Sequence, residues 1–289
     1  MLKFEVDREK CLKCGLCVSD CLTGCIEQDS EGIPQMTDKS RCINCQHCFM
    51  ICPAGAVVFN GKTSDDSEEV NFNKILPLIK SRRSIRKYKQ NDIPKLKLEK
   101  LKSMLPYIPT GCNSRLLHFS IVENKGAMDV IRRKVTERLI KSLSYSVISP
   151  VLNRFSPYKD AIKKGEDIIF RGAPHMIVVS SSIMAPCASV DPIIALSYFE
   201  LYAQSLGIGT CWCGFAQACI KSFPDICDIL KIPEGYTPKY AMLFGEPDVE
   251  YKRTPQPEPY MIESITSVED IESKPFLSKA RRVITNFIR

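Results

Sequence analysis

The chain has 289 residues, of which 44% are hydrophobic and 25% are charged, which is ordinary for a globular protein with one small and one larger domain. No apolar run approaches the roughly 18 residues that a membrane-spanning helix needs, so no membrane partner is expected. We therefore expect a soluble, cytoplasmic protein.

The net charge of +7 is distributed unevenly along the chain. Residues 1–60 contain six Lys and Arg against eight Asp and Glu, and residues 61–73 carry a net charge of −3. The remaining residues therefore carry +12. These basic residues would attract the acidic N-terminal residues, and equally an anionic cofactor, an acidic donor protein or a nucleic acid.

Nine of the fifteen cysteines lie within the first 52 residues, in two runs with the spacing C-x2-C-x2-C-x3-C. This spacing is typical of bacterial ferredoxins with two [4Fe–4S] clusters, where the fourth thiolate of each run binds the other cluster. The predicted ligands of one cluster are Cys11, Cys14, Cys17 and Cys52. Those of the other cluster are Cys42, Cys45, Cys48 and Cys21. Cys25 has no place in this scheme and is interpreted as a small buried residue.

A zinc site or a disulfide framework would account for these cysteines less well. A zinc site needs four ligands, whereas eight cysteines are spread evenly over a repeat here. A secreted disulfide framework is disfavoured because residues 1–10 are charged and lack an apolar signal core. Leu22 replaces a proline that usually follows the fourth cysteine, but that proline is not a ligand. Dependence on oxygen-labile clusters suggests an anaerobe.

Residues 61–73 are polar, acidic and without periodicity, which predicts a linker. They separate a ferredoxin domain of residues 1–60 from a body of residues 74–254. Residues 255–289 are proline-rich at first and are predicted to form an extended C-terminal arm.

The body is predicted to be α+β with a small central sheet. Short β-rich runs predict strands at Leu117–Val122, His175–Ser180 and Lys239–Phe244. Helical spacing predicts helices after Pro94, around residues 128–139, and from Asp191 to about Leu206. Asp191 and Pro192 are interpreted as the N-cap and first residue of the third helix, which Gly207 ends.

Four segments of the body carry candidate chemistry. Residues 80–88 contain five Lys and Arg, and guanidinium groups suit a phosphate. Taken alone, this cluster could also be a solvated basic face or a nucleic-acid patch. The other three segments are residues 109–119, 207–215 and 245–255.

Together, in this order and with these gaps, the four segments resemble the FMN-dependent nitroreductase family over roughly residues 74–260. The first sixty residues resemble bacterial dicluster ferredoxins, so the whole chain resembles a ferredoxin–nitroreductase fusion. The resemblance implies a three-layer α/β/α flavin domain after the small ferredoxin-like domain. It also implies an interlocked homodimer with one FMN in each interface, around which the C-terminal arm would wrap.

The resemblance also implies the FMN-binding residues. The element that holds the FMN phosphate and the pyrimidine side of the ring matches Arg82, Arg83, Ser84 and Arg86. The loop that reaches the flavin from the partner subunit matches Pro109, Thr110, Gly111 and Asn113. The turn whose backbone N–H faces flavin N5 matches Cys213 and Gly214, with Trp212 before them, and a second phosphate ligand matches Arg253.

Some residues depart from the family pattern or have a structural interpretation. Residues 115–117 are Arg-Leu-Leu where the family usually has Gln-Pro-Trp, which should alter the pocket wall. His118 and His175 lie in strand-like runs and are interpreted as satisfied core residues. The remaining cysteines are interpreted as buried small hydrophobes: Cys112, Cys187, Cys211, Cys219 and Cys227.

The expected function is that of a flavin-dependent oxidoreductase. Electrons would pass from a low-potential donor, such as reduced ferredoxin, through two [4Fe–4S] clusters to FMN. The small electron-poor substrate would be a nitro-aromatic, a quinone or an activated alkene. No catalytic side chain is assigned, and no nucleic-acid partner is expected. The alternatives are a reductive dehalogenase or other FMN enzyme of the same fold, and an electron carrier or redox sensor without its own substrate.

Overall fold

The computed structural model describes residues 3–61, 72–144, 150–255 and 257–268. The chain divides into two compact units, Met1–Arg253 and Thr254–Arg289. Most of the predicted linker, and the predicted arm beyond residue 268, lie outside the described residues. Within the described ranges, no helix is long and apolar enough to cross a membrane.

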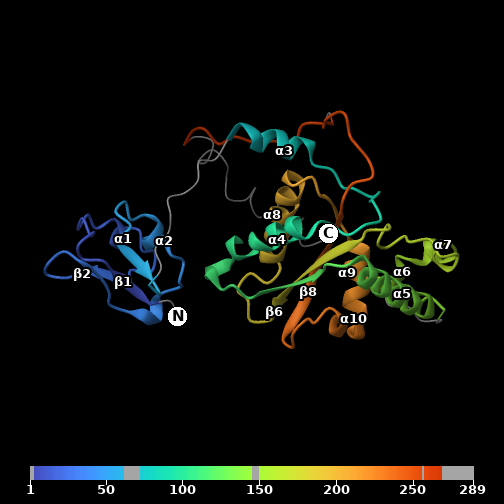
Figure 1. The fold of residues 1–289 in the computed structure, drawn as a ribbon, viewed down its shortest axis with the longest axis horizontal. Coiled ribbons are helices and arrows are strands. Elements are labelled where there is room, and N and C mark those ends of the chain that lie inside the picture. Colours follow the sequence, from blue (N-terminus) through green and yellow to red (C-terminus); the bar gives the residue numbers. More distant parts are fainter. Residues whose placement is uncertain (1–2, 62–71, 145–149, 256, 269–289) are drawn as a thin grey trace. The chain divides into compact units, whose positions relative to one another are not determined.

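The N-terminal domain contains two small antiparallel sheets and two short helices (Figure 1). One sheet pairs β1 (Phe4–Val6) with β4 (Val57–Phe59), and the other pairs β2 (Ile26–Gln28) with β3 (Pro34–Met36). Its helices are α1 (Leu16–Ser19) and α2 (His47–Met50).

The internal repeat of this domain is visible in its backbone. Gly15 precedes α1 with a φ of 73°, and Gln46 precedes α2 with a φ of 63°. Each helix therefore begins after a left-handed residue that directly follows the second cysteine of its run. Because a single left-handed residue turns the chain sharply, three cysteines of each run are brought to one loop.

The body is built around a four-stranded antiparallel sheet in the order β5-β6-β8-β7. Its strands are β5 (Leu117–Val122), β6 (His175–Ser182), β7 (Gly209–Trp212) and β8 (Tyr236–Gly245). Every residue of β6 is buried, as expected for a central strand that is covered on both faces. The three predicted strands are confirmed, whereas the short β7 was not predicted.

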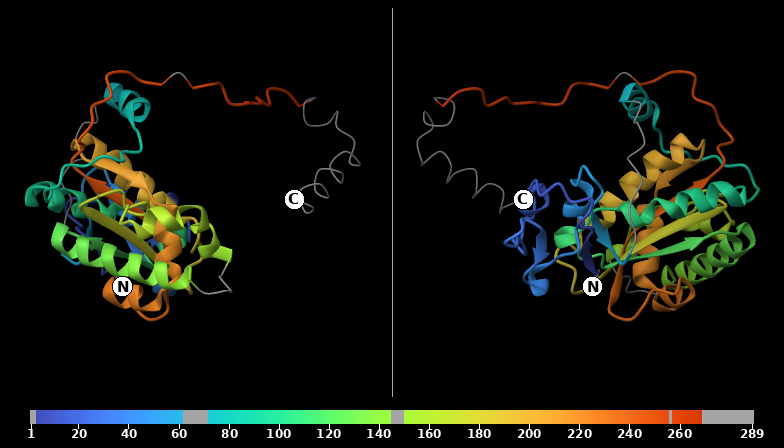
Figure 2. Two further views of the ribbon diagram at one scale, coloured as in Figure 1. Left: turned by 90° about the vertical axis from the view of Figure 1, so that its right-hand side faces the viewer. Right: turned by 60° about the vertical axis from the view of Figure 1, so that its left-hand side comes forward.

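Helices cover both faces of this sheet, which confirms the three-layer α/β/α prediction (Figure 2). The helices of the body are α3 (Ile75–Ser81), α4 (Lys95–Ser103), α5 (Lys125–Ser142), α6 (Pro150–Asn153), α7 (Lys159–Lys163), α8 (Asp191–Ser205), α9 (Gly214–Ser222) and α10 (Pro224–Ile229). The N-terminal domain also contains the short 3-10 helix η1 (Lys39–Arg41). The short 3-10 helices of the body are η2 (Phe72–Lys74), η3 (Leu105–Tyr107), η4 (Gly111–Asn113) and η5 (Ser156–Tyr158).

Alternate residues of β6 serve two different cores. Met176 and Val178 pack in the core formed with α5, α9 and α10. Ile177 and Val179 pack in the core formed with α4 and α8. This alternation follows from the two-residue period of a strand, which sends successive side chains to opposite faces.

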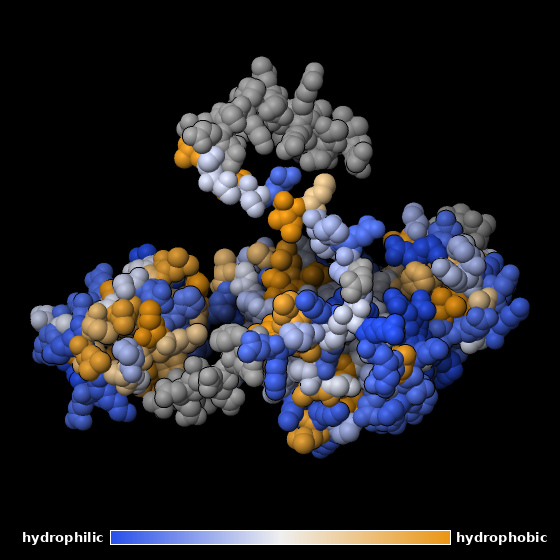
Figure 3. Space-filling view, turned by 90° about the horizontal axis from the view of Figure 1, so that it is seen from above, coloured by the Kyte–Doolittle hydropathy of each residue, from blue (hydrophilic) through white to orange (hydrophobic). Residues whose placement is uncertain are grey.

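Apolar side chains also occur on the molecular surface. In the second unit, Tyr260, Met261 and Ile262 are each more than 80% exposed. Figure 3 shows apolar side chains in separate groups among polar ones on the visible face. Large exposed apolar side chains of this kind are typical of surfaces that another molecule covers.

Candidate functional site

The eight predicted cluster ligands of the N-terminal domain line two cavities. One cavity is lined by Cys11, Cys14, Cys17 and Cys52. The other is lined by Cys21, Cys42, Cys45 and Cys48. Each cavity thus receives three thiols from one run and the fourth from the other run. Among the described residues, no three His, Cys, Asp or Glu side chains converge as a single metal ion would require; each set of thiols faces a shared space instead.

Two of these thiols lie in surroundings that disfavour their charged form. Burial, together with repulsion from Cys45 and Cys21, raises the pKa of Cys48 to about 12. Burial likewise raises the pKa of Cys17. A metal centre binds thiolates, so its positive charge must overcome this cost, and binding releases protons.

Cys25 is only 1% exposed, which agrees with its interpretation as a buried residue. The structure also places Cys25 close to one of the predicted cluster ligands, which the repeat did not predict. The Cys25 sulfur lies 3.5 Å from the sulfur of Cys21, and the Thr23 hydroxyl donates to Cys25 at 3.3 Å. The ninth cysteine therefore lines the second cavity beside one of its predicted ligands.

The basic segment of the body runs along the ends of β7 and β8. The Ile85 N–H donates to the Thr210 carbonyl at 2.8 Å, and the Lys89 N–H donates to the Glu246 carbonyl at 2.9 Å. At Gly209, a Cβ atom would come within 2.6 Å of the Ile85 side chain, so this close approach requires glycine. The backbone of Arg82 to Arg86 is thereby fixed to the sheet.

The three arginines of this segment differ in their partners. The Arg82 Nη1 atom donates to Glu200 Oε1 at 3.1 Å. The Arg83 Nη2 atom is buried and has no hydrogen-bond partner, while its Nη1 donates to the Arg82 carbonyl. Arg86 is exposed and donates to the Ser84 carbonyl at 3.4 Å. An unsatisfied buried donor such as Arg83 Nη2 fits an anionic ligand.

The loop of residues 109–113 is held by a buried carboxylate on α8. The Gly111 N–H donates to both oxygens of Asp191, at 3.1 and 3.2 Å, and Asp191 is 2% exposed. The N-cap interpretation of Asp191 was wrong, because Asp191 is the first residue of α8 and Val190 is the cap. A Cβ at position 111 would lie 2.5 Å from the Cys187 sulfur, so the loop packs too closely for a side chain there.

Other residues of this loop have separate surroundings. The Asn113 side-chain amide donates to the carbonyls of Ile43 and Asn44, at 2.9 and 3.0 Å. Cys112 is exposed, so its interpretation as a buried residue was wrong. Pro109 is also exposed, and the Thr110 hydroxyl accepts the Arg115 N–H at 2.9 Å.

A cavity of 310 Å³ opens beside Thr110. Its wall includes Arg115 and Lys102 together with the apolar side chains of Leu117 and Phe119. Arg115 and Leu117 belong to the segment that departs from the family pattern, and both line this cavity. The size is at the lower end of small-molecule sites, and the mixed lining is typical of them.

The turn between β7 and α9 is fixed by the side chain of Cys213. Its sulfur accepts the Ala216 N–H at 3.3 Å and donates to the Ile169 carbonyl at 3.2 Å. Burial raises the pKa of Cys213 to about 11. The Cys213 N–H donates to the Ala241 carbonyl, so Gly214 contributes the first N–H of α9. Arg253 is exposed at the end of the first unit.

Sequence reasoning missed Glu200, which lies next to the predicted flavin residues. Its carboxylate accepts from the Trp212 indole N–H at 3.0 Å, the Thr210 hydroxyl at 3.3 Å and Arg82. The whole residue is 5% exposed. A Glu in the middle of an otherwise apolar helix was the signal that could have revealed it, because a buried carboxylate requires donors.

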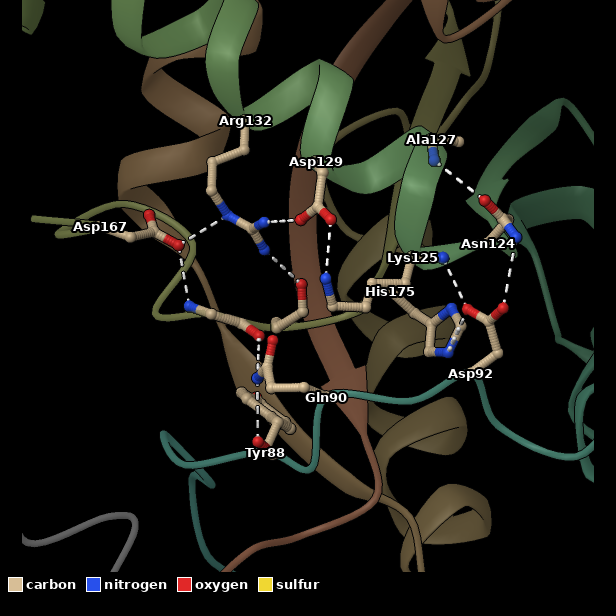
Figure 4. A network of polar contacts seen from close by, with 12 residues as sticks. Tyr88, Gln90, Asp92, Asn124, Lys125, Ala127, Asp129, Arg132, Asp167 and His175 are labelled. Carbon is tan, nitrogen blue, oxygen red and sulfur yellow. Dashed lines mark hydrogen bonds and ion pairs between the residues drawn. The ribbon is translucent and has the colours of Figure 1, made fainter. Parts of the chain in front are cut away.

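A polar network anchors the far end of the basic segment (Figure 4). The Gln90 side chain donates to the carbonyls of Tyr88 and Gly172, both at 3.0 Å. Arg132 lies between Asp129 and Asp167 and forms ion pairs with both. The network thereby ties residues 88–92 to α5 and to the loop before β6.

His175 is fully buried and satisfied, which confirms its structural interpretation. Its Nε2 atom accepts the Ile93 N–H at 3.0 Å, so Nδ1 carries the proton and donates to the Val122 carbonyl at 3.2 Å. Burial lowers the pKa of His175. It therefore supports the sheet as a neutral ring.

Comparison with known proteins relates both parts of the chain to families. Residues 10–56 match the profile of a 4Fe-4S dicluster domain, and residues 79–246 match that of the nitroreductase family. A comparison with curated proteins gave no significant match.

Solved structures give the same result for the body. A nitroreductase with bound FMN from Desulfitobacterium hafniense DCB-2 is 25% identical, with a TM-score of 0.55, and covers 68% of this chain and 100% of its own. A nitroreductase with bound FMN from Bacteroides fragilis NCTC 9343 is 24% identical, with a TM-score of 0.51 and the same coverage. Because the family profile matches more than half of the sequence, the chain belongs to the nitroreductase family and carries a 4Fe-4S dicluster domain before its nitroreductase domain.

Proposed function

We propose that the protein is an FMN-dependent oxidoreductase supplied with electrons by its own iron–sulfur domain. A low-potential donor, such as reduced ferredoxin, would reduce the two [4Fe–4S] clusters, and the electrons would reach a small electron-poor substrate by way of FMN. The observation that carries the proposal is the grouping of eight thiols into two sets of four, in one chain with a nitroreductase domain.

The residues of the N-terminal domain fit two clusters. Each cavity is lined by four predicted ligand cysteines, the number that a [4Fe–4S] cluster needs, and the second cavity is also lined by Cys25. The cavity of Cys11, Cys14, Cys17 and Cys52 would hold one cluster, and that of Cys21, Cys42, Cys45 and Cys48 the other. The Ala56 N–H donates to the Cys52 sulfur at 3.2 Å, a bond of the kind that tunes cluster potential.

The body also fits FMN. The buried, unpartnered Nη2 atom of Arg83 would donate to the phosphate, supported by Arg86 and by the Ser84 hydroxyl. The further binding residues proposed from the family resemblance are Arg82, Pro109, Thr110, Gly111, Asn113, Trp212, Cys213, Gly214 and Arg253. FMN supplies the hydride or electron chemistry, while the protein binds and orients it.

A homodimer follows from the same proposal. The exposed apolar side chains of the second unit would be covered in a dimer, and the family resemblance implies a flavin site to which two subunits contribute. A cavity of 310 Å³ opens beside Thr110, one of the residues that the family resemblance places at the flavin, and its size suits a small substrate.

The proposal is tested by purifying the full chain without oxygen and measuring iron, acid-labile sulfide and extractable flavin. We expect about eight irons and one FMN per chain. Reduced ferredoxin should then support rapid reduction of a nitro-aromatic or quinone. Cys45→Ser should abolish this reaction, while chemical reduction of the flavin by dithionite should still permit substrate turnover.

Three results would contradict parts of the proposal. Eight irons without flavin, and no uptake of added FMN, would leave an electron carrier. Turnover with NADPH alone at a rate that Cys45→Ser does not change would remove the role of the clusters. Reduction of the flavin by ferredoxin, with no substrate accepted from a panel of nitro compounds, quinones, alkenes and aryl halides, would favour a relay.

A further inference from the structure

Glu200 connects three elements that border the predicted flavin site. It lies on α8, and its carboxylate binds Arg82 of the basic segment and both Thr210 and Trp212 of β7. Both of its oxygens accept: Oε1 from Arg82 and Thr210, and Oε2 from Trp212. One side chain therefore fixes two residues that the family resemblance places at FMN.

Burial makes these contacts strong constraints. The Glu200 side chain is 7% exposed, whereas the Arg82 side chain is 34% exposed, so the carboxylate is buried more deeply than the guanidinium group. A buried carboxylate without donors is expensive, and here three donors satisfy it. If Glu200 were removed, Arg82 would lose its only ion pair in the described chain, and the Trp212 N–H would lose its acceptor.

The charge of Glu200 has a second effect. Arg82, Arg83 and Arg86 would present three positive charges to an anionic cofactor, but the Glu200 carboxylate compensates that of Arg82. Positive charge beside a flavin favours its anionic reduced form, whereas a compensating negative charge disfavours it. At a site with compensated charge, the oxidised flavin is therefore harder to reduce, and the reduced flavin is a stronger reductant.

We propose that Glu200 is a positioning residue of the flavin site, which orients Arg82 and Trp212 and keeps the reduction potential of the bound flavin low. This inference rests on the proposed function for its flavin part. The orientation of Trp212 is independent of FMN and belongs to the chain alone.

The experiment compares the wild type with three variants of the full chain, all purified without oxygen. Glu200→Gln removes the charge and keeps one of the two acceptor oxygens in a side chain of the same shape. Glu200→Leu removes both. Glu234→Gln is the control, because Glu234 is an exposed carboxylate of the same body and its replacement changes the net charge equally.

Two measurements are made on each variant. The first is the midpoint potential of the bound FMN, which should shift to a more positive value in Glu200→Gln and stay unchanged in Glu234→Gln. The second is the fluorescence of Trp212 in FMN-free protein. Trp212 is the single tryptophan of the chain, so its signal needs no assignment. Acrylamide quenching should increase at least twofold in Glu200→Leu, and by less in Glu200→Gln, which keeps one acceptor oxygen.

The outcomes separate this inference from the proposed function. An unchanged FMN potential in Glu200→Gln, or unchanged Trp212 quenching in Glu200→Leu, would overturn the corresponding part of the inference. If the wild type binds no FMN, the proposed function fails and the charge effect fails with it, while Trp212 still tests the orienting role. If Glu200→Leu does not fold, Glu200→Gln still measures the potential.

Discussion

At the scale of single residues, two buried polar groups are informative because they differ in whether hydrogen-bond partners satisfy them. Glu200 is fully satisfied although it is buried, whereas Arg83 retains a buried nitrogen without a partner. An unsatisfied buried donor costs about 1–3 kcal/mol. A site that carries this cost without ligand regains it when a ligand accepts the bond, so Arg83 is the residue at which binding should be most sensitive.

Replacement of Arg83 by Gln should therefore weaken FMN binding about 10- to 100-fold, the size expected for a lost hydrogen bond to a charged group. The free energy of unfolding without FMN should not fall, because the variant loses no satisfied side-chain contact to a neighbouring element. Titration of flavin fluorescence and urea denaturation measure the two quantities. Arg133→Gln is the control, since Arg133 forms only an exposed pair with Glu137. Equal FMN affinities for both variants would contradict the assignment.

His175 should make the body less stable in mild acid. Burial lowers its pKa in the folded protein, while the unfolded chain takes up a proton near pH 6.5. The unfolded state therefore binds more protons, and the free energy of unfolding should fall as the pH falls below about 6.5, by at most about 1.4 kcal/mol per pH unit from this group.

Urea denaturation followed through Trp212 at pH 5 to 8 measures this effect. His175→Gln should lower stability at pH 7 by about 1–3 kcal/mol, because two buried bonds are perturbed, and should flatten the pH dependence. Asp92 lies 4.0 Å from His175 and opposes the shift, but burial dominates. A wild type whose stability is constant from pH 8 to pH 5 would disprove the argument.

At the scale of elements, the sequence predicted what depends on local pattern. The strands β5, β6 and β8 and the helix α8 were predicted because apolar periodicity and a final glycine mark them. The strand β7 was missed because four residues that begin with glycine show no alternation. Its existence depends on pairing with β8, which is a long-range contact.

The candidate site also divides into features that follow from local sequence and features that depend on residues far apart in the chain. The cysteine spacing predicted both sets of thiols, because each set depends mainly on turns within one run. Glu200 was not predicted, since its partner Arg82 is 118 residues away in sequence. Asp191 was assigned to its own helix, whereas its carboxylate binds Gly111, 80 residues earlier. The sequence can indicate that a buried carboxylate needs hydrogen-bond donors, but it does not identify the residues that supply them.

The packing of Gly111 on α8 gives a test at this scale. Gly111→Ala should displace the loop, because the new Cβ would meet the Cys187 sulfur at 2.5 Å, and FMN affinity should fall at least fivefold. Adding Cys187→Ala removes that sulfur and should restore part of the affinity. Flavin titration of the single and double variants measures the coupling. Additive losses in the double variant would show that this contact does not hold the loop.

At the scale of the whole molecule, the chain joins an acidic domain of two thiol-lined cavities to a basic domain with an arginine-rich segment. The two cavities are interdependent, because each takes its fourth thiol from the other run. The protein surrounding a cluster is thus contributed by both halves of a short domain. Damage to one run should therefore affect both clusters.

Cys52→Ser tests this interdependence. Cys52 lies in the second run but lines the cavity of the first, so the variant should lose the cluster of Cys11, Cys14 and Cys17 and fall from about eight irons to about four or fewer. Iron analysis and electron paramagnetic resonance of the reduced protein measure the loss.

Cys21 and Cys25 provide a matched pair in the same domain. Their sulfurs are 3.5 Å apart, yet only Cys21 belongs to the predicted ligand set. Cys25→Ala should retain about eight irons, whereas Cys21→Ala should lose the second cluster. Equal iron loss in both variants would mean that Cys25 takes part in binding the cluster.

The crossing of ligands between the two cavities also has a consequence for biosynthesis. The chain is made from its N-terminus, so the first cavity has only three of its thiols until Cys52 has been added. The second cavity holds Cys21 early but waits for Cys42, Cys45 and Cys48. The ligand set of the second cavity is therefore complete only at residue 48, and that of the first cavity only at residue 52. A ribosome that stalls before residue 48 therefore releases a fragment in which neither cluster has its full set of thiols.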